Sequence, residues 1–502
     1  MASVKNNIAA NLIAGVWITL LTAAITPLQV NLLGIESYGL IGFIATLQIV
    51  FSAFDLGLSS TLTREIASDT SADKKRSENL IRTASAIYWL FALLVGIVLA
   101  RLANLLAANW FNAKTLSVGE IEAAIYLIVL FLALRWPVAL YTGILNGLQK
   151  MVVVNIVKVT IVSVRLLVGI LVILIYRDVE SFLLWTAISA FIEVITYFLV
   201  CQRYCQFALW KLKIHLGAIK AVWGFSLTMS AISILALFIS QFDRIIVSSL
   251  EGLTNFGYYT LAYNTSAITS LVISAVSTAM LPSFSAWQAN PSISVLQTRY
   301  LHAMNVILFL VGGASFALIF FGKIVLTLWI GHNAAAAAYL PLALLAAGFW
   351  LNAAVSNSYS VAVALGKPSL PLMVSAASAV PYAALLYYLV LSYGIVGAAM
   401  AWLILNSCYV IILVPLVHRK LLALPTAAWL VRILGLFAVL GVGSFGGARL
   451  IMCELNVSDS DWINIVAIVV GGIAYCLGGL LLLGAEIRSN LLAMFRFFPI
   501  RT

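Results

Sequence analysis

The chain has 502 residues, of which 63% are hydrophobic and 9% are charged, whereas soluble domains are typically about 45–50% apolar and about 25% charged. This composition excludes a soluble domain and predicts a polytopic membrane protein. The formal net charge of +11 does not indicate nucleic-acid binding, because the basic residues lie in alternate loops and form no stripe interleaved with aromatic residues.

Hydropathy predicts fourteen membrane-spanning helices, since a span needs about 20 predominantly apolar residues. The first exceeds the apolar segment of about 7–15 residues that is typical of a cleaved signal peptide. The connecting loops are short and leave no extramembrane domain. In chain order the predicted spans are 8–33, 38–62, 82–108, 121–145, 152–176, 181–202, 221–249, 257–281, 304–330, 339–364, 369–393, 395–417, 427–449 and 463–484.

The orientation follows from the distribution of Lys and Arg over the loops. If the N-terminus is inside, nineteen of the 28 basic residues fall on inner loops and edges and four on outer ones. Because cytoplasmic loops carry an excess of Lys and Arg, this asymmetry predicts that both termini are cytoplasmic.

A sequence phrase in the first half of the chain recurs in the second half. The segments 33–67 and 253–286 are similar, and an offset of 218 residues pairs Gly34 with Gly252 and Gly39 with Gly257. In membrane transporters such repeats usually place a site at their interface. We expect these four glycines to form tight turns on the outer side of the membrane and to take part in gating, because small residues permit tight backbone geometry.

Several predicted spans carry polar residues at spacings of three and four, which is one face of a helix. Two interpretations remain open: these faces are close-packing surfaces between helices, or they line a shared cavity. On the first, second, seventh and eighth spans they are Asn11, Gly15, Thr22, Thr26 and Gln29; Gln48, Ser52, Asp55 and Ser59; Ser226, Ser230, Ser233, Gln241 and Arg244; and Ser266, Ser270, Ser274 and Ser277.

Eight ionisable residues fall inside the predicted spans, where each costs about 2.5–3.5 kcal/mol even on the lenient insertion scale. Four of them, Asp55, Glu193, Asp243 and Arg244, are candidates for a coupling or cavity charge, and Asp55 is equally a candidate for a structural partner. Asp243 and Arg244 are adjacent, hence about 100° apart on a helix, and Asp243 is expected to pair across helices. The eight are Arg135, Lys158, Arg165, Arg244, Lys323, Asp55, Glu193 and Asp243.

The fourth and fifth spans carry a basic cluster. Lys158 and Arg165 are seven residues apart, so they share a helix face and lie about 10 Å apart along its axis. Arg135 lies at a similar depth, and no acid on these two spans neutralises the cluster. The sequence therefore predicts an anion site at these three residues. The alternative is that Arg165 pairs with Asp55 or Glu193 and that Lys158 extends to the inner surface.

A set of motifs resembles the bacterial polysaccharide flippases, the O-antigen and exopolysaccharide branch of the superfamily that also holds the multidrug and toxin extrusion exporters and the lipid II flippase. Each motif is short, but their order and spacing extend over essentially the whole chain. They are G-x-x-x-Y-G at Gly34, D-x-G-L at Asp55, G-L-Q-K at Gly147, D-R-I-I at Asp243 with G-Y-Y at Gly257, and Y-G-I-V-G-A-A-M-A-W-L-I at Tyr393.

The resemblance implies an all-α fold with two six-helix lobes, residues 1–210 and 215–420, related by a pseudo-two-fold axis along the membrane normal. Two additional helices and a cytoplasmic tail would occupy 421–502. It also implies a cationic lumen, which Arg135, Lys158 and Arg165 would supply here. The implied substrate is an undecaprenyl-pyrophosphate-linked oligosaccharide that moves from the inner to the outer leaflet.

These features lead to the hypothesis of a flippase in the bacterial cytoplasmic membrane that works by alternating access. Arginine suits a pyrophosphate because its planar fork bonds two oxygens at once. The undecaprenyl tail would stay among the membrane lipids, and a polysaccharide polymerase and chain-length machinery would be downstream partners. We expect no catalytic residue and no cofactor, and the sequence holds no G-x-x-x-x-G-K-[ST] motif for ATP.

Two other functions are open alternatives. A drug or cation antiporter of the same superfamily would need acids at its centre, whereas the intramembrane charges here are five basic and three acidic. A membrane-embedded glycosyltransferase or polymerase would need acids or bases at the membrane surface, and the longest outer loop, 449–462, carries acids without a basic or histidine partner. The four histidines lack metal-ligand spacing, so no metal site is expected.

Overall fold

The structure is a computed structural model that describes residues 2–53, 55, 57–67, 74–205, 209, 234–235, 237–285, 293–455 and 461–483. Within these ranges the regular structure is helical, and no strand occurs in them. The chain divides into two compact units, residues 1–257 and 258–502.

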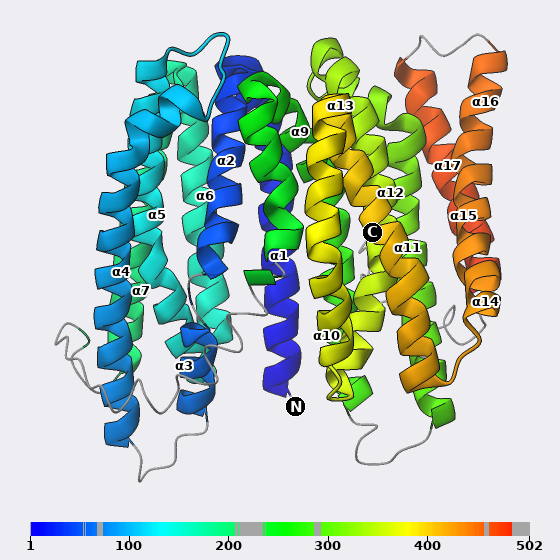
Figure 1. The fold of residues 1–502 in the computed structure, drawn as a ribbon, viewed down its shortest axis with the longest axis horizontal. Helices are drawn as coiled ribbons and strands as arrows, with labels where there is room; N and C mark the ends of the chain where they lie inside the picture. The colour runs from blue at the N-terminus through cyan, green and yellow to red at the C-terminus, as the bar shows by residue number, and fades with distance from the viewer. Residues whose placement is uncertain are drawn as a thin grey trace, which may run out of the picture. The chain divides into compact units, whose positions relative to one another are not determined.

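In the first unit α5 occupies the centre, packed against α3, α4 and α7, while α6 packs against α1 and α7 (Figure 1). The core lies where α3, α4, α5 and α7 meet, and Tyr88 and Tyr197 are fully buried there. The helices are α1 (Ala2–Leu33), α2 (Ile35–Ala53), α3 (Leu58–Ala67), α4 (Lys74–Asn109), α5 (Val118–Gly147), α6 (Met151–Tyr176), α7 (Val179–Tyr204) and the start of α9 (Gly252–Ala267).

In the second unit α12 packs against α10, α11 and α13. Gly394 has φ 59° and ψ −138°, which divides α13 between the predicted spans 369–393 and 395–417. Short π-helical turns join α14, α15 and α16 into one rod beside α17 (Figure 1). The helices are α10 (Thr269–Ser285), α11 (Ile293–Trp329), α12 (His332–Ala364), α13 (Ser369–Val417), α14 (Thr426–Trp429), α15 (Leu436–Gly441), α16 (Gly447–Glu454) and α17 (Asp461–Leu482).

Eleven helical stretches among the described residues are long and apolar enough to cross a membrane. The predicted spans 369–393 and 395–417 form one of these stretches, and the predicted span 257–281 is divided between α9 and α10 at Ile268. Residues 221–233 and 236 of the predicted span 221–249, which include the predicted polar residues Ser226, Ser230 and Ser233, lie outside the described residues. The all-α polytopic fold class is thus confirmed, while the pseudo-two-fold axis and the lobe limits at 210 and 420 stay predictions.

The prediction of one continuous span over 38–62 is wrong. The helix stops at Ala53 and a separate helix, α3, starts at Leu58; α2 and α3 occupy different heights in the unit (Figure 1). Gly57 adopts φ +66° in the break, and the Asp55 carboxylate accepts hydrogen bonds from the Ser59 N–H and hydroxyl at 3.3 and 2.7 Å. An acidic side chain that binds the first N–H groups of a helix favours a new start at this point.

Tertiary packing holds α3 in place against α5. The Thr63 hydroxyl donates to the Gly143 carbonyl at 2.9 Å, and a Cβ added at Gly143 would lie 2.9 Å from the Ser59 carbonyl oxygen. The two helix backbones can approach this closely only because position 143 carries no side chain. Small residues at such crossings are typical of membrane helix pairs.

The predicted turn glycines divide into two kinds. Gly34 and Gly252 have φ values of +84° and +73°, which L-residues with a side chain rarely adopt. Gly34 directly precedes α2, and Gly252 is the first residue of α9. Gly39 and Gly257, expected in turns, instead lie inside α2 and α9. There they allow a helix crossing: a Cβ at Gly39 would lie 2.9 Å from the Leu253 carbonyl oxygen, and one at Gly257 would collide with the Ile35 carbonyl oxygen.

This crossing follows the sequence repeat. The offset of 218 residues relates Ile35 to Leu253 and Gly39 to Gly257. Gly39 lies against Leu253 and Gly257 lies against Ile35, so the two contacts are equivalent under the repeat. The contact lies within residues 1–257. The equivalent segments of the repeat are therefore in direct contact at this point.

Candidate functional site

Three helices of the first unit meet at Glu193, whose side chain is 2% exposed on α7. Arg135 on α5 donates from Nε to Oε2 of Glu193 at 3.1 Å. Arg165 on α6 donates to the same oxygen through a terminal nitrogen and also donates from Nε to the Ser189 hydroxyl at 2.6 Å. The carboxylate thus connects α5, α6 and α7. The two arginines and the glutamate together carry a net charge of +1.

Both guanidinium groups lie near the ring of Phe131, with Cζ of Arg135 at 5.8 Å and Cζ of Arg165 at 5.3 Å from the ring centroid. An aromatic ring attracts a cation electrostatically at such distances. Phe131 therefore helps to keep two like charges in one small region of the membrane interior.

The two arginines differ in accessibility. The side chain of Arg165 is 11% exposed and that of Arg135 is 29% exposed. Arg165 has its hydrogen bonds inside the protein, which corresponds to the alternative interpretation, pairing with Glu193. Arg135 shares only its Nε–H with Glu193 in the hydrogen bonds of the described residues, so its terminal nitrogens remain available to a ligand.

A polar cavity of about 390 Å³ opens beside Arg135. Lys158, exposed on α6, lines the same cavity together with Arg135 and Glu193. Asn155 donates to the Asn11 side-chain oxygen at 2.6 Å, which connects α6 to α1 at the wall. The lining residues are Asn11, Arg135, Val138, Thr142, Asn146, Met151, Val154, Asn155, Lys158, Glu193 and Tyr197.

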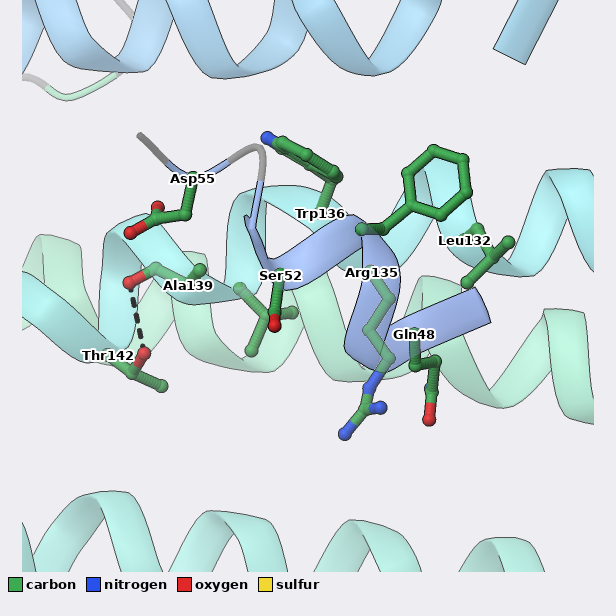
Figure 2. A pocket seen from close by; sticks show the side chains of 10 residues that line it. Gln48, Ser52, Asp55, Leu132, Arg135, Trp136, Ala139 and Thr142 are labelled. Carbon is green, nitrogen blue, oxygen red and sulfur yellow. Dashed lines mark hydrogen bonds between the residues drawn. The ribbon is translucent and has the colours of Figure 1, made fainter. Parts of the chain in front are cut away.

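A second cavity, of about 220 Å³, also borders Arg135 and shares Arg135, Val138 and Thr142 with the first. Figure 2 shows the guanidinium of Arg135 and the amide of Gln48 directed to one side of this space, while the carboxylate of Asp55 lies on the other. The lining residues are Gln48, Phe51, Ser52, Asp55, Leu132, Arg135, Trp136, Val138, Ala139 and Thr142.

Asp55 lies in the break between α2 and α3 and faces the smaller cavity. Its carboxylate accepts from Ser59 and from the Tyr88 hydroxyl on α4. Neither Arg135 nor Arg165 pairs with it among the ion pairs of the described residues. Of the two acids considered as partners of Arg165, the structure selects Glu193.

Asp243 and Arg244 are both buried in the helix over residues 237–250. A carboxylate oxygen of Asp243 accepts from the Arg244 backbone N–H at 2.8 Å. Neither residue lines the two cavities at Arg135. A role of these two residues in coupling stays a prediction.

Sequence reasoning missed Glu36, a buried carboxylate in the first turn of α2 that is 3% exposed. Its Oε1 accepts from the Lys114 N–H at 2.9 Å and the Thr254 hydroxyl at 2.6 Å. Its Oε2 accepts from the Thr115 N–H at 2.9 Å, the Thr115 hydroxyl at 2.5 Å and the Leu116 N–H at 3.2 Å. Five donors and no cation therefore satisfy this carboxylate in the described structure.

Two signals in the sequence could have identified Glu36. An acid in the first turn of a helix is stabilised there by the helix dipole. In addition, the offset of 218 residues pairs Glu36 with Thr254, the residue whose hydroxyl it binds. Successive backbone N–H groups such as those of residues 114–116 form a concave anion-binding surface.

Comparison with known proteins adds to these observations. Residues 4–288 match the family described as "Polysaccharide biosynthesis protein". The chain belongs to this family. A relative in Shigella flexneri, named "Putative O-antigen transporter", is 27% identical over 380 residues, which cover 74% of this chain and 87% of that protein. The family resemblance indicated by the sequence motifs is confirmed.

Solved structures with the same fold include the lipid II flippase MurJ in an inward closed conformation. It has a TM-score of 0.71 at 16% identity, over 93% of this chain and 97% of that one. A multidrug resistance transporter of the MATE family in an inward-facing conformation has a TM-score of 0.63 at 16% identity, over 82% and 94%. At these identities the likeness shows the fold of the family member and leaves its substrate to be argued from the site.

Proposed function

We propose that this protein is a flippase that moves an undecaprenyl-pyrophosphate-linked oligosaccharide from the inner to the outer leaflet of the bacterial inner membrane by alternating access. The observation that carries the proposal is the 390 Å³ cavity with Arg135 and Lys158 on its wall. Its one acidic lining residue, Glu193, is also bonded to Arg165. The cavity region therefore has an excess of positive charge inside the membrane, and a pyrophosphate supplies the missing negative charge.

The roles of the three predicted basic residues follow from their accessibility. Arg135 would bind the pyrophosphate through its terminal nitrogens, and Lys158 would contribute a second positive charge at the same cavity. Arg165 would be a positioning residue, because it holds Glu193 and thereby the Nε of Arg135. Family membership and the relative named as an O-antigen transporter support the saccharide part of the substrate.

The test is export of surface polysaccharide, with protein abundance measured in parallel, by cells that depend on this protein. Arg135→Ala should reduce export, Arg135→Lys should restore it in part, and Arg135→Glu should be worse than Ala because it repels the phosphates in a poorly screened site. Arg101→Ala, an exposed arginine on α4, is the matched control. Normal export by Arg135→Glu at normal abundance would contradict the anion site.

The predicted orientation, with both termini in the cytoplasm, can be tested separately. In a variant without the five native cysteines, a cysteine at Lys114, before α5, should react with an impermeant thiol reagent on whole cells. A cysteine at Lys150, at the other end of α5, should not react until the membrane is opened. Both native side chains are exposed. Labelling of position 150 from outside would reverse the orientation.

Transport of a cationic dye is the measurement for the antiporter alternative. Dye transport by the wild-type protein, together with unaltered polysaccharide export in the Arg135 variants, would favour that alternative.

A further inference from the structure

We propose that the smaller cavity, lined by Gln48, Ser52, Asp55, Trp136 and Thr142, is a saccharide subsite that binds the sugar next to the pyrophosphate. This inference rests on the proposed function and makes it more specific. It assigns the phosphates to the larger cavity and the sugar to the smaller one, and Arg135 lines both cavities.

The first argument is the chemistry of the hydrogen-bonding groups. The Ser52 hydroxyl donates to the Ile49 carbonyl at 2.6 Å, and the Thr142 hydroxyl donates to the Ala139 carbonyl at 3.0 Å. Since each hydroxyl has a single hydrogen, both oxygens can only accept from a ligand. A ligand with several hydroxyl donors, such as a sugar, satisfies such a wall.

Asp55 adds a third acceptor. Three hydrogen bonds, from the Ser59 N–H, the Ser59 hydroxyl and the Tyr88 hydroxyl, use three of its roughly four lone-pair positions. These bonds fix the carboxylate at the edge of the cavity (Figure 2). A carboxylate in this position repels a phosphate and accepts from a sugar hydroxyl. The smaller cavity is thus unsuited to the anion that fits the larger one.

Donors are present on the other walls. Gln48 offers an amide with two N–H groups and an acceptor oxygen, and Trp136 offers one indole N–H. Neither group has a hydrogen bond among those found in the described ranges. Ring oxygens, hydroxyls or an N-acetyl carbonyl of a saccharide would satisfy them. The guanidinium of Arg135, near Gln48 in Figure 2, completes the donor side.

The aromatic rings give the subsite a rigid apolar wall. Trp136 is half-buried and packs against Phe91, with centroids 4.9 Å apart, and against the edge of Phe51 at 5.9 Å. The C–H face of a sugar ring packs well on an indole held in this way. At about 220 Å³ the cavity is below the range of roughly 300–1,000 Å³ that is usual for drug-sized ligands, which suits a single ring.

The test measures binding of two classes of lipid to the full-length protein in detergent. One is undecaprenyl pyrophosphate without sugar; the other is a panel of undecaprenyl pyrophosphates that carry one hexose, one N-acetylhexosamine or a disaccharide. Thermal stabilisation at several lipid concentrations reports each Kd. Wild-type protein should bind at least one saccharide-bearing lipid about tenfold more tightly than the sugar-free lipid.

Gln48→Leu is the main variant, because the described structure shows no hydrogen bond of the Gln48 side chain that the substitution would remove. The ratio of the affinity for the saccharide-bearing lipid to that for the sugar-free lipid is the sugar-dependent gain. Gln48→Leu should reduce this gain by about two- to tenfold, the effect of one neutral hydrogen bond, and leave binding of the sugar-free lipid unchanged. Trp136→Leu should abolish the gain. Trp462→Leu, which removes an exposed indole from α17, is the control. Arg135→Ala should weaken binding of both lipid classes.

The outcomes separate the two proposals. If the wild-type protein binds the sugar-free lipid and shows no gain for any saccharide, or if Gln48→Leu and Trp136→Leu keep the full gain, the subsite is wrong and the flippase proposal stands. If the wild-type protein binds neither class, or if Arg135→Ala binds the sugar-free lipid normally, the proposed function fails.

Discussion

Two buried glutamates of the first unit are accommodated in opposite ways. Glu193 is bonded to two arginines that share one of its oxygens. Glu36 is bonded to three backbone N–H groups and two hydroxyls. Neutral donors occupy both oxygens of Glu36 and leave no acceptor position for a ligand. At Glu193 the cations exceed the acid, so that site can accept a further anion.

This difference indicates which carboxylate belongs to a binding site and which to the framework. Glu36 connects the α4–α5 loop to the first turns of α2 and α9, where the repeat segments cross. Glu193 positions the arginine that borders both cavities. The following predictions test the comparison, from the largest expected effect on stability to the smallest.

The largest loss of stability should come from Glu193→Ala. Removal of one partner from a buried ion pair leaves charges uncompensated and costs about 3–5 kcal/mol. We expect a lower thermal unfolding temperature of the purified protein and a lower abundance in the membrane. The double variant Arg165→Leu with Glu193→Leu should recover most of both. Wild-type stability of the single variant would mean that the ion pairs contribute nothing.

Glu36→Ala should destabilise less, by about 1.5–3 kcal/mol for the loss of charge-assisted hydrogen bonds. The stability of Glu36→Gln should lie between that of Glu36→Ala and that of the wild type, because glutamine keeps one acceptor oxygen. Hydrogen exchange at residues 114–116 should accelerate in both variants. The matched control is Glu122→Ala, since Glu122 is exposed on α5. Equal effects of Glu36→Ala and Glu122→Ala would remove the distinction between the two carboxylates.

Gly39→Leu tests the predicted role in gating of the crossing between α2 and α9, which lies beside the Glu36 contact. The new side chain would collide with the Leu253 carbonyl, and such overpacking costs about 1–3 kcal/mol. Export should fall while the protein stays in the membrane, and Gly257→Leu should behave alike. Gly119→Leu, where an added Cβ meets open space, is the control. Normal export by both crossing variants would exclude a role in gating.

The smallest change in stability should come from Lys158→Ala, within about 0.5 kcal/mol, because the side chain is exposed. Binding of undecaprenyl pyrophosphate should nevertheless weaken, and Lys158→Arg should restore it. Lys323→Ala, an exposed lysine on α11 that lines neither cavity, should leave binding unchanged. If the Lys158 and Lys323 variants bind equally, the cavity charge does not recruit the anion.

The sequence alone determined the membrane class and most of the helical stretches long and apolar enough to cross a membrane. These features depend on the length of apolar runs, and in lipid a long apolar run becomes a helix because every backbone N–H and C=O must be bonded within it. The repeat at an offset of 218 residues also predicted that Gly39 and Gly257 correspond, and the structure brings them to one crossing.

Only the tertiary structure decided which charges pair. Glu193 lies 58 residues from Arg135 and 28 from Arg165, and hydropathy holds no information on which faces of α5, α6 and α7 meet. The break at Asp55 was likewise missed, because the apolar residues around it predict a continuous helix. Packing of α3 on α5 and the hydrogen bonds from Ser59 favour two helices instead. Glu36 was overlooked because its partners, apart from Thr254, come from the α4–α5 loop, whose backbone N–H groups no sequence pattern marks.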